Sequence, residues 1–226
     1  MTRTEFLEAL DRLVDEKHLL HHPFYVLWSE GKLTREHLRE YAISYYPHVA
    51  AFPRYVSGVH AGSPDAALRQ ELLENLIEEE RGEENHPALW RRFAAAVGAR
   101  DEDLSAKPRS PEVADLVGTF LETTRSGSVA EGLAALYAYE SQIPEISKTK
   151  REGLAAFYGI TDPEAVRFFS VHETADVWHR QVEREALGRV ADTEAEREKA
   201  LAAAQRCLDA LNRALDGVCR ENGIAA

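Results

Sequence analysis

Apolar residues recur along the chain with charged residues between them, in a pattern typical of amphipathic helices that pack against one another. No stretch shows the apolar–polar alternation between turn signals that predicts a β-strand. The sequence therefore predicts an all-α protein, with glycine and proline residues near the helix ends. The predicted helices span residues 4–18, 34–51, 52–61, 64–85, 86–98, 111–125, 129–140, 143–158, 163–188 and 193–221.

Several helix starts carry recognisable signals. Three segments place a capping residue before a proline and an acid: Ser63-Pro64-Asp65, Ser110-Pro111-Glu112 and Asp162-Pro163-Glu164. Thr193 and Glu196 fit a capping box, in which each side chain binds a backbone N–H near the other residue. The polar segment 99–110 is interpreted as a loop, and residues 1–226 are expected to form a single helical-bundle domain.

Charge and cysteine content narrow the class of protein. The 226 residues carry a formal net charge of −12, from 27 basic and 39 acidic residues, which argues against nucleic acid or an anionic membrane as a partner. No apolar run approaches a membrane span, and the first residues show no secretory segment. Cys207 and Cys219 stand 12 residues apart in one predicted helix, about 18 Å at the standard rise, which is too far for a disulfide. A reduced, cytoplasmic protein is expected.

The triplet His172, Asp176 and His179 is the strongest chemical signal. Offsets of four and seven residues put the three side chains on one helix face, where two imidazoles and a carboxylate can bind a transition metal. The segment also begins like the HExxH motif of zinc proteases, but its fifth position is Asp176 rather than histidine. Glu173 points about 100° away from His172 on a helix, so the protease interpretation is rejected.

Three upstream residues extend this set. Glu79 and His86 are seven positions apart, and Glu140 ends an otherwise apolar helical run. Together the six residues match the ligand inventory of a carboxylate-bridged two-metal site in a helix bundle. Glu79 taken alone is more typical of a solvated acidic face. Pro87 disfavours helical geometry at His86, so a kink is expected there, after Gly82.

Aromatic residues are concentrated in the N-terminal third, among them Tyr25, Tyr41 and Tyr45. Tyr41 and Tyr45 share a helix face, either as ordinary core or as the wall of a pocket beside an oxidising metal centre. Lys150 belongs to the polar run 147–151, and composition alone favours a solvated position for it.

The order of these residues resembles the heme-oxygenase-like diiron oxidases. Within that family it is most similar to the branch of the chlamydial protein associating with death domains and its bacterial relatives. The resemblance extends from Phe24-Tyr25 to His179 and includes Tyr-Tyr-Pro at 45–47, the segment 139–144 and Lys148-Thr149-Lys150. All six ligand positions of the family are filled: Glu79, His86, Glu140, His172, Asp176 and His179.

This resemblance implies a seven-helix bundle related in shape to TenA and PqqC proteins, with two metal ions (Fe/Fe or Mn/Fe) and O2 as a co-substrate. It implies an oxidoreductase that makes p-aminobenzoate, a folate precursor, from the protein's own tyrosine in a single turnover. By the same resemblance Tyr25 is the tyrosine consumed, Tyr41 is a redox helper and Lys150 is the amino donor. An external reductant is implied, and a homodimer is expected because related bundles associate through helix faces.

Two alternatives share part of this pattern. A diiron oxygenase acting on an external small molecule could use the same ligands, and it differs in needing an added substrate. A helical protein-interaction module is the second alternative, since the chlamydial namesake contacts death domains. Thiaminase activity is disfavoured because both cysteines lie near the C-terminus, and heme degradation would leave the six-residue set without a role.

Overall fold

The computed structural model describes residues 1–225, apart from the side chains of residues 174–177, and the described part contains helices and no strands. The helices are α1 (Arg3–Glu16), η1 (Leu19–His21), α2 (Pro23–Ser29), α3 (Arg35–Gly62), α4 (Ala66–Glu80), α5 (His86–Ala96), η2 (Asp101–Asp103), α6 (Pro111–Ser126), α7 (Val129–Glu140), α8 (Ile143–Tyr158), α9 (Arg167–Val190) and α10 (Glu194–Glu221), where η marks a 3₁₀ helix. The predicted all-α fold class is confirmed. The described part of the chain contains ten α-helices, more than the seven implied by the resemblance, and short breaks separate α4 from α5 and α7 from α8.

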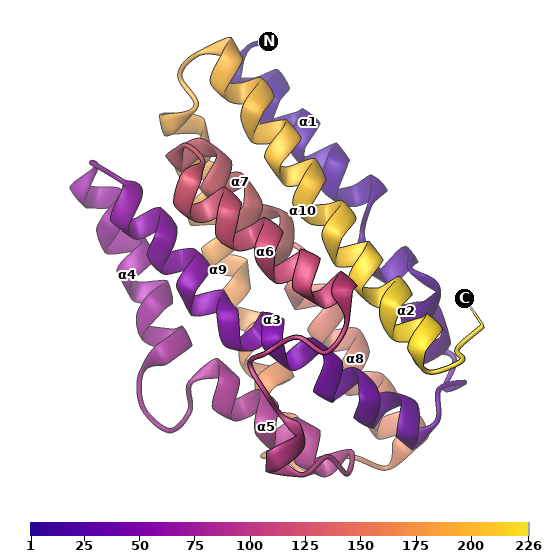
Figure 1. The fold of residues 1–226 in the computed structure, drawn as a ribbon. Coiled ribbons are helices and arrows are strands. Elements are labelled where there is room, and N and C mark those ends of the chain that lie inside the picture. Colours follow the sequence, from indigo (N-terminus) through magenta and orange to yellow (C-terminus); the bar gives the residue numbers. More distant parts are fainter. Residues whose placement is uncertain (226) are drawn as a thin grey trace.

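The long helices lie side by side in an elongated bundle. In Figure 1, α3, α6, α7 and α10 run in a similar direction, α1 lies along α10, and α4 and α5 lie toward the opposite side of the molecule. Helix α9 packs against α7 and α8 and also contacts α4 and α5. Every helix that carries a predicted metal ligand therefore borders α9, which places those ligands in one region of the bundle.

Helix α3 is one continuous helix of 28 residues, although the sequence predicted two. Pro47 and Pro53 each remove one backbone donor, which disfavours a continuous helix. Both prolines lie inside the helix and are buried. Packing of this largely buried helix against α4, α5 and α6 outweighs the lost hydrogen bonds.

Side-chain caps mark most of the observed helix starts. Two helices, α4 and α9, begin later than predicted. Thr193 and Glu196 form the predicted capping box of α10, and Ser110 caps α6 ahead of Pro111. At α4, however, the cap is Asp65 rather than Ser63. At α9 the helix begins at Arg167, four residues later than predicted, because the segment after Pro163 forms a turn first. Short helix α2 was not predicted; the Nδ1 atom of His22 caps it by accepting from Phe24 N–H.

A turn separates α4 from α5, so the first of these helices ends five residues before the predicted boundary at residue 85, and the kink predicted after Gly82 is part of this turn. Helix α4 ends at Glu80, and Gly82 follows with a φ of 77°, a left-handed conformation that favours glycine. The side chain of Asn85 then caps α5 by accepting from Ala88 N–H at 2.9 Å, with Pro87 in the first turn. This turn brings the end of α4 close to the start of α5, so that Glu79 and His86 are in contact.

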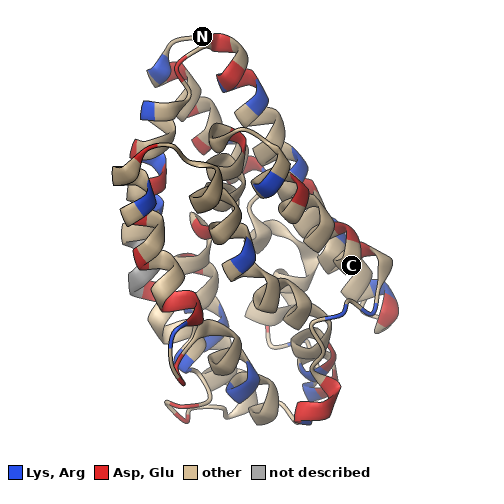
Figure 2. Ribbon diagram, turned by 60° about the vertical axis from the view of Figure 1, so that its left-hand side comes forward, with Lys and Arg blue, Asp and Glu red and all other residues tan. Residues whose placement is uncertain are grey.

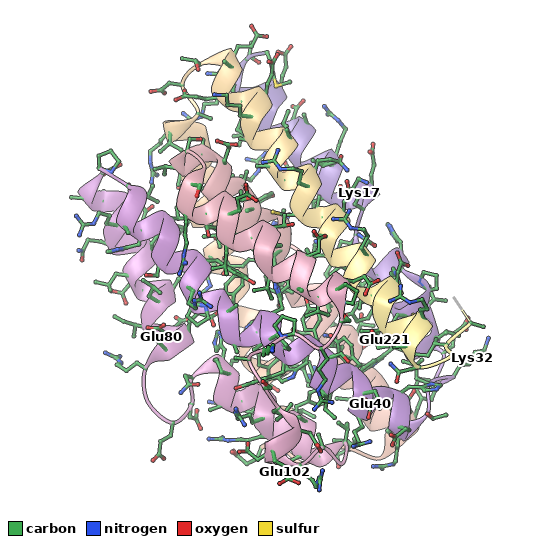
Figure 3. All side chains as sticks on the ribbon, viewed as in Figure 1. Lys17, Lys32, Glu40, Glu80, Glu102 and Glu221 are labelled. Atoms are coloured by element: carbon green, nitrogen blue, oxygen red, sulfur yellow. The ribbon has the colours of Figure 1, made fainter. Side chains whose placement is uncertain are left out.

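Charged residues of both signs are distributed over the outside of the bundle, as Figure 2 shows. Glu80, labelled in Figure 3, is exposed at the end of α4, whereas its neighbour Glu79 is buried. No helix among the described residues is long and apolar enough to cross a membrane. Cys207 and Cys219 are both buried in α10 and are not bonded to each other, as predicted.

Candidate metal centre and amine pocket

The turn between α4 and α5 joins two predicted ligands. Glu79 lies in the last turn of α4 and His86 is the first residue of α5, and both side chains are buried. His86 Nδ1 and Glu79 Oε1 are 2.7 Å apart, a hydrogen-bond distance. The alternative of a solvated face for Glu79 is therefore wrong. The two residues meet across a turn, and not along one face of a single helix.

His172 of α9 completes a three-residue cluster with this pair. Its ring centroid lies 4.2 Å from that of His86, and its Nδ1 is 2.6 Å from the carbonyl oxygen of Phe168. A carbonyl only accepts, so Nδ1 carries the proton and the lone pair of the neutral ring lies on Nε2. Glu79, His86 and His172 each place one ligand atom within 4.8 Å of the others, an arrangement that could hold a metal ion.

Glu140, the last residue of α7, lies close to this cluster, with only 2% of its surface exposed. Asn75 of α4 donates from Nδ2 to Glu140 Oε1 at 2.9 Å. The other oxygen, Oε2, is buried and has no hydrogen-bond partner within the described part of the chain. A buried carboxylate oxygen in this condition is unfavourable unless a cation lies against it.

His179 lies seven residues after His172 on α9 and is also buried. Its Nε2 is 3.5 Å from Glu78 Oε2, and it acts electrostatically on both Glu79 and His86. The predicted ligand Asp176 lies between the two histidines of α9, but its side chain is outside the described residues. The metal corner, as we name Glu79, His86, Glu140, His172 and His179, thus collects five of the six predicted ligands.

Burial and charge set the protonation of the metal corner. Burial, followed by repulsion from Glu140, raises the pKa of Glu79 well above its ordinary value. Burial lowers the pKa of His86 to about 4, so its imidazole is neutral at neutral pH, as a metal ligand requires. Two buried carboxyl groups and the neutral imidazole of His86 in one place form a donor set suited to a transition-metal cation.

Lys150 is buried in α8, contrary to the solvated position that composition favours; only 4% of its surface is exposed. Its Nζ donates to the Tyr41 hydroxyl at 2.7 Å and lies 5.0–5.9 Å from the centroids of five aromatic rings. We call this group the amine pocket; it consists of Lys150, Tyr25, Tyr41, Tyr45, Trp90 and Phe169. Burial lowers the pKa of Lys150 to about 7, so a large fraction of its amine is uncharged at neutral pH.

The spacing of apolar residues on α8 contains the signal for this burial. Ile146 and Leu154 lie four residues before and after Lys150, and both are buried. Lys150 therefore occupies the apolar face of α8, which the composition of the 147–151 run conceals. Gly153 lies on the same side, and a Cβ added there would come within 2.8 Å of the Trp28 ring. The absence of a side chain at Gly153 lets α8 approach α2 closely.

Tyr25 and Tyr41 face each other inside the amine pocket. Their hydroxyl oxygens are 3.1 Å apart, so Lys150, Tyr41 and Tyr25 form one chain of hydrogen bonds. The Lys150 Nζ is 5.2 Å from the centroid of the Tyr25 ring. Burial raises the pKa of both phenols, which keeps them protonated at neutral pH. The structure thus brings the three predicted catalytic residues together.

Phe168, which belongs to neither group, contacts both the amine pocket and the metal corner. The Trp90 ring contacts Tyr41 on one side, with centroids 5.8 Å apart, and Phe168 on the other, at 4.9 Å. Phe168 in turn packs against His172 at 4.2 Å. The two groups are therefore neighbouring compartments of one interior, with aromatic rings between them.

Comparisons with known proteins agree with this architecture. Residues 39–212 match the family described as iron-containing redox enzyme. The 4-aminobenzoate synthase of Nitrosomonas europaea is 47% identical, with 96% of this chain and 92% of that protein aligned. The 4-aminobenzoate synthase of Chlamydia trachomatis is 42% identical, with 93% and 90% aligned.

Among solved structures, a domain from Shewanella denitrificans with a heme-oxygenase-like fold superposes with a TM-score of 0.81. The match covers 99% of this chain and 94% of that chain at 20% identity, so it bears on the fold alone. The family match and the two similar synthases confirm the predicted resemblance. This chain belongs to the family of iron-containing redox enzymes, and it has their heme-oxygenase-like fold.

Proposed function

We propose that this protein makes p-aminobenzoate by an O2-dependent reaction in which Tyr25 provides the aromatic ring and Lys150 the amino group. The observation that carries the proposal is the buried Lys150 amine, which is hydrogen-bonded to Tyr41 and lies 5.2 Å from the centre of the Tyr25 ring. Two proteins named 4-aminobenzoate synthase, 47% and 42% identical to this chain, support the same product.

The metal centre would consist of two ions, Fe/Fe or Mn/Fe, held by Glu79, His86, Glu140, His172, Asp176 and His179. The donor set fits: three ligand atoms lie within 4.8 Å of one another, and the buried Glu140 Oε2 has no hydrogen bond among the described residues. Bound there, the metals would supply O2 activation and the oxidising equivalents needed to cleave a tyrosine side chain. An external reductant would provide electrons.

The residues of the amine pocket have separate tasks in this proposal. Comparing a tyrosine side chain with p-aminobenzoate, the amino group replaces the phenolic hydroxyl and Cβ becomes the carboxyl carbon once its bond to Cα breaks. Lys150 supplies the nitrogen: its Nζ bonds to the ring carbon that loses the phenolic oxygen, and the Cε–Nζ bond of the lysine breaks, with O2 and the external reductant balancing the electrons. The lowered pKa of about 7 leaves a nucleophilic lone pair on Nζ at neutral pH. Tyr41 lies between the two reacting groups and can pass a proton between them.

The covalent attachment of both reactants is an advantage in positioning and a limit on turnover. Tyr25 and Lys150 are held by α2 and α8, so no substrate has to be ordered at the site. The surrounding rings exclude water from the amine. Because both side chains are consumed, each protein molecule would react once.

The experiment is to incorporate ring-labelled tyrosine, reconstitute the protein anaerobically with iron and manganese, add reductant and O2, and measure labelled p-aminobenzoate. Tyr25→Phe and Lys150→Met should each abolish the labelled product. Tyr137→Phe is the matched control for the first, since it removes a buried hydroxyl bound to Asp11 on another face of the bundle. Lys148→Met, an exposed change on the same helix, is the control for the second. Wild-type yield from Tyr25→Phe would refute the use of Tyr25 and favour an external substrate.

A further inference from the structure

Asn75 makes the hydrogen bond that orients Glu140, yet it is not among the predicted ligands. It lies on α4 one helical turn before Glu79, and therefore on the same helix face. Its side chain is 3% exposed, and its Nδ2 donates to Glu140 Oε1 at 2.9 Å. The bond joins residues 65 positions apart in the sequence, from two helices that both border the metal corner.

The orientation of the Asn75 amide is determined by its partner. A carboxylate oxygen only accepts hydrogen bonds, so the NH2 group must face Glu140 and the amide oxygen must point away. That amide oxygen, Oδ1, is buried and has no hydrogen-bond partner within the described residues. Asn75 lines a small pocket together with the apolar residues Leu68, Leu72 and Leu133 and the polar residues His179 and Glu183. The Asn75 amide therefore has one buried oxygen without a hydrogen bond among the described residues. Such an arrangement is typical of a residue that is kept for a functional site.

The two oxygens of Glu140 are unequal as a result. Oε1 is engaged by Asn75, whereas Oε2 is buried without a hydrogen bond in the part of the chain that the structure describes. Glu140 also acts electrostatically on Glu79 and His86, so the carboxylate lies near the other donors. Fixing one oxygen of a carboxylate restricts its rotation and leaves the other available to a cation.

We propose that Asn75 is a positioning residue of the metal centre, which holds Glu140 through Oε1 so that Oε2 serves as the ligand atom. This inference rests on the proposed ligand set. Hydrogen-bond partners of metal ligands commonly change metal affinity by about 10- to 100-fold when they are removed. Asn75→Leu, which keeps a similar size but removes the donor, should weaken binding at the Glu140 metal by a factor in that range.

The test is an anaerobic titration with Mn(II) in which electron paramagnetic resonance measures binding. It compares four proteins: wild type, Asn75→Leu, Glu140→Gln and the double variant. If Asn75 acts through Glu140, Asn75→Leu weakens Mn(II) binding in the wild-type background and has no further effect when Glu140 is already Gln. A purely structural role would weaken binding by the same factor in both backgrounds, and that result overturns the inference. Asn75→Ala is measured in parallel, because it removes the same donor without placing a leucine side chain in the site.

The matched control is Asn212→Leu, which removes a side-chain amide that donates to Lys17 O at 3.2 Å and Leu208 O at 3.0 Å, away from the metal corner. It should leave Mn(II) binding unchanged. Failures of the two proposals are distinguishable. Wild-type binding by Glu140→Gln contradicts the ligand set itself. Weakened but still measurable binding by Glu140→Gln, together with unchanged binding by Asn75→Leu and Asn75→Ala, contradicts only the role of Asn75.

Discussion

The amine pocket and the metal corner differ in how far the protein alone satisfies their polar groups. In the amine pocket, Lys150, Tyr41 and Tyr25 are joined by hydrogen bonds and enclosed by aromatic rings. In the metal corner, burial and the nearby Glu140 carboxylate raise the pKa of Glu79, and Glu140 Oε2 has no hydrogen bond among the described residues. The polar groups of the amine pocket are therefore paired within the protein, whereas the metal corner contains buried donor atoms that a bound cation would stabilise.

The largest expected effect is on the metal corner, because its stability should depend on bound metal. We expect His172→Ala and Glu140→Ala to lose metal occupancy, measured by elemental analysis after anaerobic reconstitution with iron and manganese. At 100 times its Kd, a metal that binds only the folded chain stabilises it by about 2.7 kcal/mol, so a chelator should lower the wild-type unfolding temperature. His60→Ala, outside the predicted set, is the control. Wild-type stoichiometry below one metal per chain would contradict the two-metal assignment.

The amine pocket should instead show a pH dependence that does not need metal. Lys150 has a pKa of about 7 in the folded protein and an ordinary value of 10.5, so between these values the unfolded chain binds one more proton. The free energy of unfolding therefore rises with pH from 7 to 9, by up to about 1.4 kcal/mol per unit, and this gain is absent below pH 7. Denaturant unfolding of the apo-protein should show this slope, relative to Lys150→Met.

The slope has its own control. Lys148→Met should retain it, because Lys148 is exposed on the same helix. Equal pH dependence in wild type and Lys150→Met would mean that the Lys150 amine keeps an ordinary pKa and is not buried.

The rate of product formation should follow the same titration. Only the neutral amine is nucleophilic, so the single-turnover rate should rise about tenfold per pH unit below 7 and level off above it. Metal should be loaded at one fixed pH and the reaction started by a pH jump with O2, because metal binding is itself pH-dependent. A flat rate between pH 5.5 and 7 would indicate that the amine is not involved in the slow step.

Tyr41→Phe is expected to have the smallest effect on stability and a clear one on reaction. It removes the acceptor for Lys150 and the partner of Tyr25, two hydrogen bonds whose loss costs about 1 kcal/mol each. Product yield should fall sharply while the helical circular dichroism spectrum and the metal content stay at wild-type values. Unchanged yield would remove Tyr41 from the reaction and leave it a wall residue.

Local signals in the sequence predicted much of the fold. The bounds of α7 and α8 agree with the predicted 129–140 and 143–158, because Ser128 caps α7, Pro144 stands in the first turn of α8 and Gly159 ends α8 in a left-handed conformation. Helix α3 was divided wrongly, since the packing of a buried helix outweighs two prolines and no local pattern reports that packing. Short helix α2 was missed because its seven residues are too few for a periodic signal.

The candidate site was predictable to a different extent in its two parts. Helix periodicity predicted that His172 and His179 lie on one helix, and both are buried on α9. It did not predict how Glu79 and His86 meet, because a turn separates α4 from α5. The burial of Lys150 could have been predicted from the spacing of Ile146 and Leu154 around it, but its role was assigned only through resemblance, because the surrounding rings come from α2, α3, α5 and α9. Asn75 gave no sequence signal, since its role depends on Glu140, which approaches it from another helix.

The most direct test of the central claim is intact-mass spectrometry with peptide mapping, before and after the reduced, metal-loaded protein is exposed to O2. The protein should lose mass once, in step with p-aminobenzoate release. The changes should be confined to the peptides that contain Tyr25 and Lys150. Product released from a protein whose mass at both residues is unchanged would contradict the account and show that the ring and the amine come from elsewhere.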